Sequence, residues 1–242
     1  MELAGRVALV TGAGQRLGRA IAASLAGRGM AVAIHFNASA DGAESLRDEI
    51  RAAGGRAECF GADLTDAHAA RALPGRVVEA FGGLDVLVNS AAVMHRLDLE
   101  ETTVEQWDAI IGLNLRAVFF CTQGAVAALR KAGGRVINIA DLGGLEPWPS
   151  YAAHSVSKAG VVMLTRVLAR SLAPEVTVNA IAPGTVLPPE RMSEDKIRGL
   201  AERTPLKKNG SPEDVVRALR YLLQADFVTG ETLVVDGGRI LR

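Results

Sequence analysis

The chain of 242 residues has little cysteine, few aromatic residues and no excess charge of either sign. Its two cysteines, Cys59 and Cys121, lie far apart in apolar surroundings, so we interpret them as reduced core residues rather than a metal or redox pair. Basic and acidic residues number 27 each, which gives no electrostatic indication of binding to nucleic acid or to an anionic membrane. We therefore expect no metal site and no nucleic-acid partner.

Long apolar runs and a targeting segment are also lacking. The N-terminus, MELAGRVALVTG, has no basic stretch followed by a long apolar one. By inspection, no run approaches the roughly 20 apolar residues that a membrane span needs. We therefore expect a cytoplasmic protein that does not bind membranes.

The sequence has instead an alternation of short aliphatic runs with longer amphipathic segments. The runs are RVALVTG, AVAIHF, AECFGAD, LDVLVNSA, GRVINIAD, VTVNAIAPG and ETLVVDGG. Between them lie helical patterns, several of which stop at glycine, the usual signal for a helix C-terminus. Nearly continuous apolar strands joined by helices predict a parallel α/β sheet covered on both faces. With no linker or repeat in view, we expect one domain over residues 1–242 with a doubly wound sheet of seven strands.

The first strand runs directly into a glycine-containing turn and a helix, ALVTGAGQRLGRAIA, residues 8–22. Small residues at such a turn let the backbone approach a pyrophosphate at the helix N-terminus. The position of the turn, after the first strand and before the first helix, predicts a dinucleotide site. An ordinary strand–helix turn is the alternative.

The turn resembles the TGxxxGxG turn of the short-chain dehydrogenase/reductase family. Thr11, Gly12 and Gly18 match it, and Arg16 replaces the middle glycine, as in the pteridine reductase branch. Further matches are GADL, NSAA, LNLRAVFF, NAIAPGTV, TPLKKNGSPEDVVRALRYLL and FVTGETLVVDGG, so the resemblance covers almost the whole chain. It implies a Rossmann-type fold with a nicotinamide cofactor. The cofactor-binding residues that it implies are Thr11, Gly12, Gln15, Arg16, Leu17, Gly18, His35, Asn37, Ser39, Asp63, Leu64, Asn89, Ser90, Ala91, Ile139, Lys158, Pro183, Gly184 and Val186.

The second strand indicates which nicotinamide cofactor is preferred. Sites for NAD usually end this strand with a carboxylate that binds the ribose 2′-hydroxyl, but here it ends AIHFNAS. Arg16, His35, Asn37 and Ser39 can all donate hydrogen bonds to a 2′-phosphate. We therefore expect NADPH. The alternatives are a solvated Arg16 and a half-buried His35 at the strand end.

The segment SYAAHSVSKAG, residues 150–160, resembles the catalytic helix of the family, in which a serine, a tyrosine and a lysine act together. The family tyrosine lies four residues before the lysine, on the same helix face. Lys158 fits the lysine, but His154 occupies the tyrosine position. Asp141 stands where most members have serine and the pteridine reductases have aspartate. Asn114 matches the asparagine of the middle helix, although it could instead bend that helix by bonding to the backbone.

Three interpretations of this centre are open. In the first, His154 donates the proton and the Asp141 carboxylate stabilises the imidazolium, while Lys158 opposes it. In the second, Tyr151 supplies a phenol from one turn earlier on the same helix face, displaced by about 4.5 Å along the axis. In the third, the protein binds NADPH without catalysis and serves as a sensor or scaffold.

The resemblance implies hydride transfer to a C=O or C=N group of a small substrate. Pteridine reductases hold a flat pterin against an aromatic ring, but that position here is Met94, which stacks more weakly. Reduction of 3-oxoacyl thioesters, as in generic members, is the alternative. His95 and Trp148 are candidates for the pocket lining, and residues 186–205 are predicted to close as a lid.

Two predicted helices, residues 115–129 and 159–172, are apolar almost all round. A helix without a polar face needs burial on more than one side. The sheet supplies one side and another subunit can supply the other. Together with this pattern, the resemblance, which implies the dimers and tetramers common in the family, favours a homotetramer, with a homodimer as the alternative.

Overall fold

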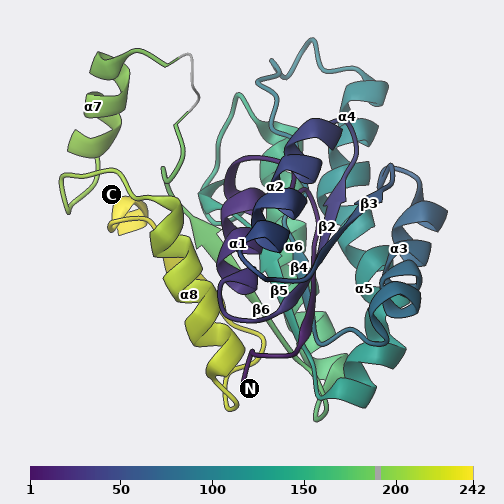
Figure 1. Ribbon diagram of the computed structural model, residues 1–242. Coiled ribbons are helices and arrows are strands. Elements are labelled where there is room, and N and C mark those ends of the chain that lie inside the picture. Colours follow the sequence, from purple (N-terminus) through teal and green to yellow (C-terminus); the bar gives the residue numbers. More distant parts are fainter. Residues whose placement is uncertain (189–191, 242) are drawn as a thin grey trace.

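The computed structural model describes residues 1–188 and 192–241 and contains a seven-stranded parallel sheet (Figure 1). The strand order is β3-β2-β1-β4-β5-β6-β7. The central strands are buried on both faces, as their aliphatic sequences require. This arrangement confirms the predicted Rossmann-type doubly wound sheet. The strand bounds are β1 Val7–Val10, β2 Ala31–Phe36, β3 Ala57–Gly61, β4 Val86–Asn89, β5 Arg135–Ile139, β6 Thr177–Pro183 and β7 Thr232–Val235.

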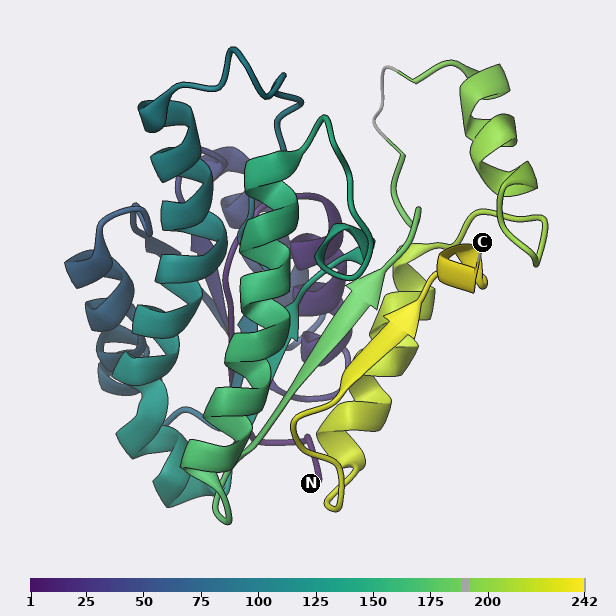
Figure 2. The same ribbon diagram turned by 180° about the vertical axis from the view of Figure 1, so that it is seen from behind.

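Helices cover both faces of the sheet (Figures 1 and 2). Because alternate strand residues point to opposite faces, Ala8 and Val10 of β1 join one core, which includes residues of α1, α2 and α8. Val7 and Leu9 join the other, which includes residues of α3, α5 and α6. The bounds of these helices are α1 Arg16–Ala26, α2 Ala40–Ala52, α8 Pro212–Gln224, α3 Ala67–Phe81, α5 Ala117–Ala132 and α6 Ala152–Leu172.

One helix is longer and more apolar than inspection of the sequence suggested. Helix α4 (Val104–Ile111) continues through a π-helical turn, η1 (Gly112–Arg116), into α5. The combined helix, Val104–Ala132, has 29 residues and mean hydropathy 1.4 in its most apolar window, so by length and composition it could cross a membrane. The expectation that no segment approaches a membrane span was therefore wrong. In this structure Cys121, Ala125 and Leu129 of that helix pack in the core under the sheet.

The carboxyl ends of the parallel strands meet at one edge of the sheet. There β1 leads into α1 on one face and β4 leads towards α4 and α5 on the other, which is the switch point where doubly wound sheets bind ligands. Two short helical turns, η2 (Leu142–Gly144) and η3 (Arg239–Leu241), follow β5 and β7 at this edge. Helix α7 (Glu194–Glu202) stands apart from the sheet beside it (Figure 2). Residues 189–191 of the predicted lid lie outside the described residues.

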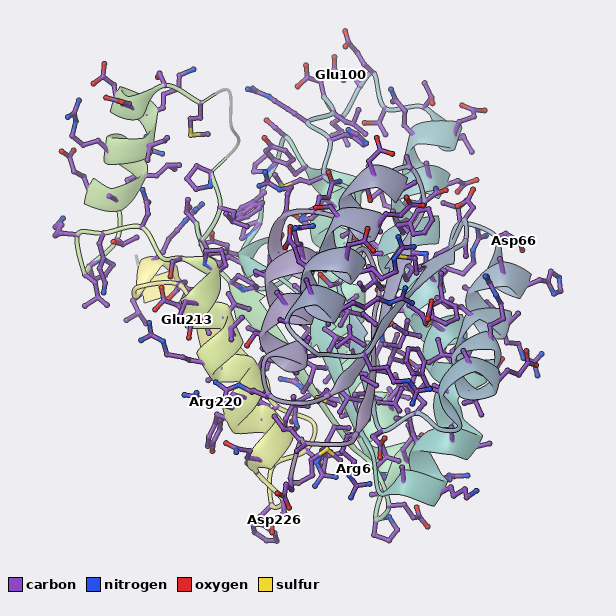
Figure 3. The ribbon with its side chains drawn as sticks, viewed as in Figure 1. Arg6, Asp66, Glu100, Glu213, Arg220 and Asp226 are labelled. Atoms are coloured by element: carbon purple, nitrogen blue, oxygen red, sulfur yellow. The ribbon has the colours of Figure 1, made fainter. Side chains whose placement is uncertain are left out.

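The opposite edge is held by a buried carboxylate. Asp85 accepts hydrogen bonds from Val7 N and Arg6 Nη1, both at 2.8 Å, and so ties β1 to the start of β4. Figure 3 shows Arg6 at the end of the molecule remote from Glu100, which follows β4 on the site side. The Arg6–Asp85 ion pair thus lies at the end of the molecule remote from Glu100.

Candidate active site

The turn after β1 is built for close approach of a ligand to the backbone. Gly12 has a positive φ of 66°, and a Cβ at Gly18 would lie 2.2 Å from the Gly12 carbonyl oxygen, so neither accepts a larger residue. The N-cap of α1, Gln15, makes no side-chain capping bond. The N-terminal N–H groups of α1 therefore remain available to an anion. This uncapped glycine cradle fits the pyrophosphate of a dinucleotide.

A cavity of about 930 Å³ opens over this turn at the carboxyl edge of the sheet. Most of the residues that the sequence predicted line it, from Gly12 at one end to His154 at the other. The predicted residues that line it are Gly12, Gln15, Arg16, Leu17, Gly18, His35, Asn37, Ser39, Asp63, Leu64, Ser90, Ala91, Ile139, Asp141, Tyr151, His154, Lys158, Pro183, Gly184 and Val186. The structure thus brings the predicted cofactor and catalytic residues together.

Three predicted residues, Thr11, Asn89 and Asn114, lie behind the lining and support it. Thr11 Oγ1 accepts hydrogen bonds from Ser90 N at 2.9 Å and Ala91 N at 3.0 Å, which joins the ends of β1 and β4. The Asn89 amide donates to Asn138 Oδ1 at 2.9 Å inside the sheet. For these two residues, the bonds indicate a supporting role rather than direct contact with a cofactor.

Asn114 lies in the π-helical turn and fixes the loop after β4. Its side chain exchanges two hydrogen bonds with the backbone of Val93, each of 2.9 Å. Its Nδ2 atom also lies 3.2 Å from Ser157 Oγ and 3.4 Å from His154 Nδ1. These bonds go to other segments rather than to the backbone of its own helix, so they do not support the alternative in which Asn114 only bends that helix.

His154 and Asp141 form a close pair in the cavity wall. His154 Nε2 lies 2.6 Å from Asp141 Oδ2, and His154 Nδ1 lies 3.3 Å from the Val93 carbonyl oxygen. Asp141 Oδ1 accepts a 2.7 Å bond from Gly143 N. The imidazole is 3% exposed and the carboxylate 20%, so of the two side chains the carboxylate is the more accessible. The predicted adjacency of these two residues is confirmed.

The charges around this pair shift one another. Burial raises the pKa of Asp141, but the hydrogen bond with His154 and the positive charges of His154 and Lys158 outweigh it, so that pKa lies below its ordinary value. Burial lowers the pKa of Lys158 to about 8, against the opposing pull of the Asp141 carboxylate. Lys158 Nζ donates to the Ile139 carbonyl oxygen at 2.7 Å. Because this pKa is near physiological pH, the Lys158 side chain can gain or lose a proton there when a neighbouring charge changes.

Tyr151 differs from its predicted position. It precedes α6 as the N-cap, with φ −139° and ψ 40°, so it does not share a helix face with His154 as expected. The Tyr151 ring instead makes an edge-to-face contact with Trp148, with ring centroids 6.1 Å apart. Tyr151 still lines the cavity. Trp148 also lies parallel to the His154 imidazole, at 6.2 Å between centroids and 10° between planes.

Two predicted donors to a 2′-phosphate have other partners. His35 Nδ1 accepts from Gly12 N at 3.0 Å, and Nε2 lies 3.1 Å from the Ala62 carbonyl oxygen, so neither nitrogen can donate to a phosphate. Burial lowers the pKa of His35 to about 4, which keeps the ring neutral. The Arg16 guanidinium donates to the Leu187 carbonyl at 2.7 Å. That part of the prediction was wrong for His35, because β2 is covered on both faces.

Three functional features were missed by sequence reasoning. Arg239, after the last strand, lines the cavity. So does Leu142, and the Val93 carbonyl oxygen contacts His154. A signal for Arg239 existed, since the residue directly after VDGG must lie near the carboxyl end of β7, where parallel strands bind ligands. No side-chain pattern could have revealed a backbone carbonyl.

Comparison with known proteins agrees with this geometry. A family model described as enoyl-(acyl carrier protein) reductase matches residues 12–239. The chain is 37% identical to 3-oxoacyl-[acyl-carrier-protein] reductase of Synechocystis over 99% of this chain and 98% of that protein. It is 36% identical to 3beta-hydroxysteroid dehydrogenase 1 of Eggerthella lenta over 99% and 95%. The chain belongs to the short-chain dehydrogenase/reductase family. It is accordingly an oxidoreductase, and members of this family bind NAD(P).

A solved structure of the same family bears on the cofactor. FolM Alternative dihydrofolate reductase 1 from Brucella canis, complexed with NADP, superposes with a TM-score of 0.94. It is 31% identical in sequence, and the match covers all of this chain and 96% of that one. The 3-oxoacyl reductases among the relatives do not single out the pteridine reductase branch, so membership of that branch stays a prediction.

Proposed function

We propose that this protein uses NADPH to reduce a C=O or C=N group of a small substrate, with the Asp141–His154 pair supplying the proton. The observation that carries this is the 2.6 Å contact between the two side chains in the cavity wall. When bound, the reduced nicotinamide supplies a hydride. The protein must then deliver one proton to the substrate oxygen or nitrogen.

The pair can hold that proton because its remaining contacts are fixed. With a proton on Nδ1 directed to the Val93 carbonyl, His154 Nε2 and Asp141 Oδ2 share one further proton. The amide N–H of Gly143 holds the other carboxylate oxygen. After transfer to the substrate the pair is left with one proton fewer, as an imidazole beside a carboxylate, and solvent reprotonates it. Lys158, one helical turn away, carries a positive charge that favours the carboxylate.

The preference for NADPH over NADH is supported by the end of β2. The cavity lining there includes Asn37 and Ser39, and within the described residues no carboxylate of the β2–α2 connection lines it. A carboxylate would repel a 2′-phosphate, whereas an amide and a hydroxyl can donate to one. Arg16 lies on the cavity wall but is directed to Leu187.

The first experiment follows NADPH oxidation by nicotinamide absorbance with dihydropterins, quinonoid pterins, diketones and 3-oxoacyl thioesters. The natural protein and the His154→Tyr variant are compared. Turnover of one class by the natural protein, with a slower variant, supports the proposal. Turnover by the variant alone would show that the natural pair cannot donate a proton and would overturn it.

Reduction of 3-oxoacyl thioesters is the second candidate. It is supported by the names of the relatives, several of which are 3-oxoacyl-[acyl-carrier-protein] reductases. Its substrate is distinguished by a thioester and a long pantetheine arm. A higher kcat/KM for an acyl thioester than for the matching methyl ketone would favour this candidate over small-carbonyl reduction.

We also propose a cytoplasmic homotetramer, with a homodimer as the alternative. The outward side of α6 exposes Val156, Met163 and Val167, each more than 50%, and α5 exposes Phe119 at 40%. Apolar side chains in such numbers on two adjacent helices favour contact with another subunit. Met163→Glu should reduce the mass measured by light scattering, whereas an unchanged mass would place the interface elsewhere.

A further inference from the structure

The end of the cavity around η3 contains an arginine that the proposed reaction does not use. Arg239 lines the cavity directly after β7. Its Cζ atom lies 5.5 Å from the centre of a Trp148 ring, and that side chain stacks parallel to His154. The guanidinium and the His154 imidazole therefore both lie next to the Trp148 side chain.

The guanidinium of Arg239 is weakly engaged. Its Nη1 atom lies 3.3 Å from Thr185 Oγ1, and its Nη2 atom lies 3.9 Å from Glu146 Oε1, beyond hydrogen-bonding distance. That Glu146 oxygen already accepts a 2.8 Å bond from the Trp148 indole N–H. An arginine has five N–H donors arranged as a fork that matches a carboxylate. Most of this capacity has no close partner among the described residues.

The other basic side chains of the cavity already have partners. Among the described lining residues these are Arg16, which bonds Leu187 O, and Lys158, which bonds Ile139 O. The remaining two are the paired His154 and the neutral His35. Arg16 and Lys158 belong to the predicted cofactor contacts, which leaves Arg239, with its 3.3 Å bond to Thr185 and 3.9 Å ion pair with Glu146, as the described basic lining residue that the proposed reaction does not use.

The remaining surroundings are mostly apolar. Outside the predicted cofactor contacts and the Asp141–His154 pair, Arg239 is the one charged residue among the described lining residues. Glu146 forms a 3.9 Å ion pair with the guanidinium but does not itself line the cavity. The larger apolar side chains of this lining are Met94, Leu113, Leu142, Trp148, Leu187, Met192 and Leu200. An apolar chamber with a single convergent cation favours an apolar ligand with one anionic group.

We infer that the substrate is an oxo or imino carboxylic acid, with its carboxylate on Arg239 and its reducible C=O or C=N group at the Asp141–His154 pair. The inference rests on the proposed function, because it names the substrate class of that same cavity. Trp148 is near both contact points, since it lies within 6.2 Å of the His154 ring and 5.5 Å of the Arg239 guanidinium. A fork-shaped contact with Arg239 also fixes which end of the substrate faces the pair.

The test compares acids with their uncharged esters. Kinetic constants with NADPH are measured for phenyl-substituted 2-oxo and 4-oxo carboxylates and for their methyl esters. The acids should have a kcat/KM about tenfold higher than the esters, the magnitude of one charge-assisted hydrogen bond. Arg239→Gln should remove this preference by raising KM for the acids, and Arg239→Lys should restore part of it.

A matched variant controls for the loss of one positive charge. Arg28 is exposed in the turn between α1 and β2, so Arg28→Gln changes the net charge equally and should leave both substrates unaffected. Equal rates for acids and esters in the natural protein would overturn the inference. So would an equal loss for both substrates in Arg239→Gln, which would mean that Arg239 only supports Trp148.

A binding measurement separates this inference from the proposed reaction. Calorimetry with NADP⁺ present compares 4-phenylbutanoate, which cannot be reduced, with its amide. Binding of the acid that is at least about tenfold tighter and is lost in Arg239→Gln supports the carboxylate site, even if no carbonyl compound turns over. In that case the reduction proposal fails alone. Equal binding of acid and amide, or no binding of the acid, overturns the carboxylate site.

Discussion

The Nε2 atom of His154 lies 2.6 Å from the Oδ2 atom of Asp141, across a gap of 13 residues in the sequence. Asp141 is the N-cap of the short helical turn η2 after β5, and His154 lies in the first turn of α6. Their contact, together with the Val93 carbonyl and the Asn114 amide, fixes an imidazole beside a carboxylate in the cavity wall. The short contact makes the protonation of each residue depend on the other.

The pair should act as one unit in catalysis. His154→Ala and Asp141→Asn should each lower kcat by about 10² to 10⁴, the usual contribution of a positioned proton donor. The double variant should be no slower than the slower single variant, because either change removes the shared proton. Steady-state kinetics measure this, and NADPH affinity from fluorescence titration should stay within about twofold. Additive losses would show that the two residues act independently.

Burial of Lys158 should lower the stability of the protein without cofactor. Its pKa is lowered from 10.5 to about 8, so the unfolded chain binds the proton more tightly. Lys158→Met should therefore raise the free energy of unfolding by up to about 3 kcal/mol below pH 8. The gain should shrink as pH rises from 8 towards 10.5, where the folded lysine is neutral. Urea unfolding at several pH values measures it, and a gain constant with pH would contradict this reasoning.

The cofactor preference should depend on Asn37. An aspartate at this position would bring a carboxylate to the end of β2 and repel a 2′-phosphate. We expect Asn37→Asp to lower kcat/KM for NADPH at least tenfold, by about 1.4 kcal/mol or more, and to change that for NADH much less. The ratio of the two values is the readout. If it does not change, recognition of the phosphate lies with other residues.

The turn after Asp141 should tolerate no side chain. A Cβ at Gly143 would lie 2.9 Å from Trp148 Cε3 and 3.1 Å from Asp141 Oδ1. Gly143→Ala should displace these groups, reduce stability by about 1–3 kcal/mol and lower kcat more than KM. As a control, Gly75→Ala in α3 meets nothing within 4 Å and should stabilise slightly. Thermal unfolding and kinetics of both variants decide the matter.

Much of the fold followed from periodicity, and less of the site did. Apolar runs separated by amphipathic segments were enough to predict that there are seven strands and that they run parallel. The spacing of four residues from His154 to Lys158 placed both on α6. Tyr151 could not be placed in the same way, because a helix boundary depends on local backbone angles rather than on residue spacing.

Other residues eluded prediction for different reasons. The strand that carries His35 is buried on both faces, so alternation could not indicate that the ring faces Gly12. Arg16 adopts φ 51°, which directs its side chain towards Leu187 in a way that no propensity suggests. Arg239 follows a predicted strand, but its proximity to Trp148 depends on tertiary packing.

The burial of His35 beside the Gly12 amide has a consequence for acidic conditions. The pKa of His35 is lowered from 6.5 to about 4, so the unfolded chain takes up a proton first as the solution is acidified. The protein should therefore lose stability between about pH 6.5 and 4 while the folded ring remains an acceptor for the Gly12 amide. The nucleotide-binding turn keeps its shape across this interval in every molecule that is still folded. Mild acid would thus lower the fraction of protein that is folded, while the affinity of the folded protein for its cofactor would not change.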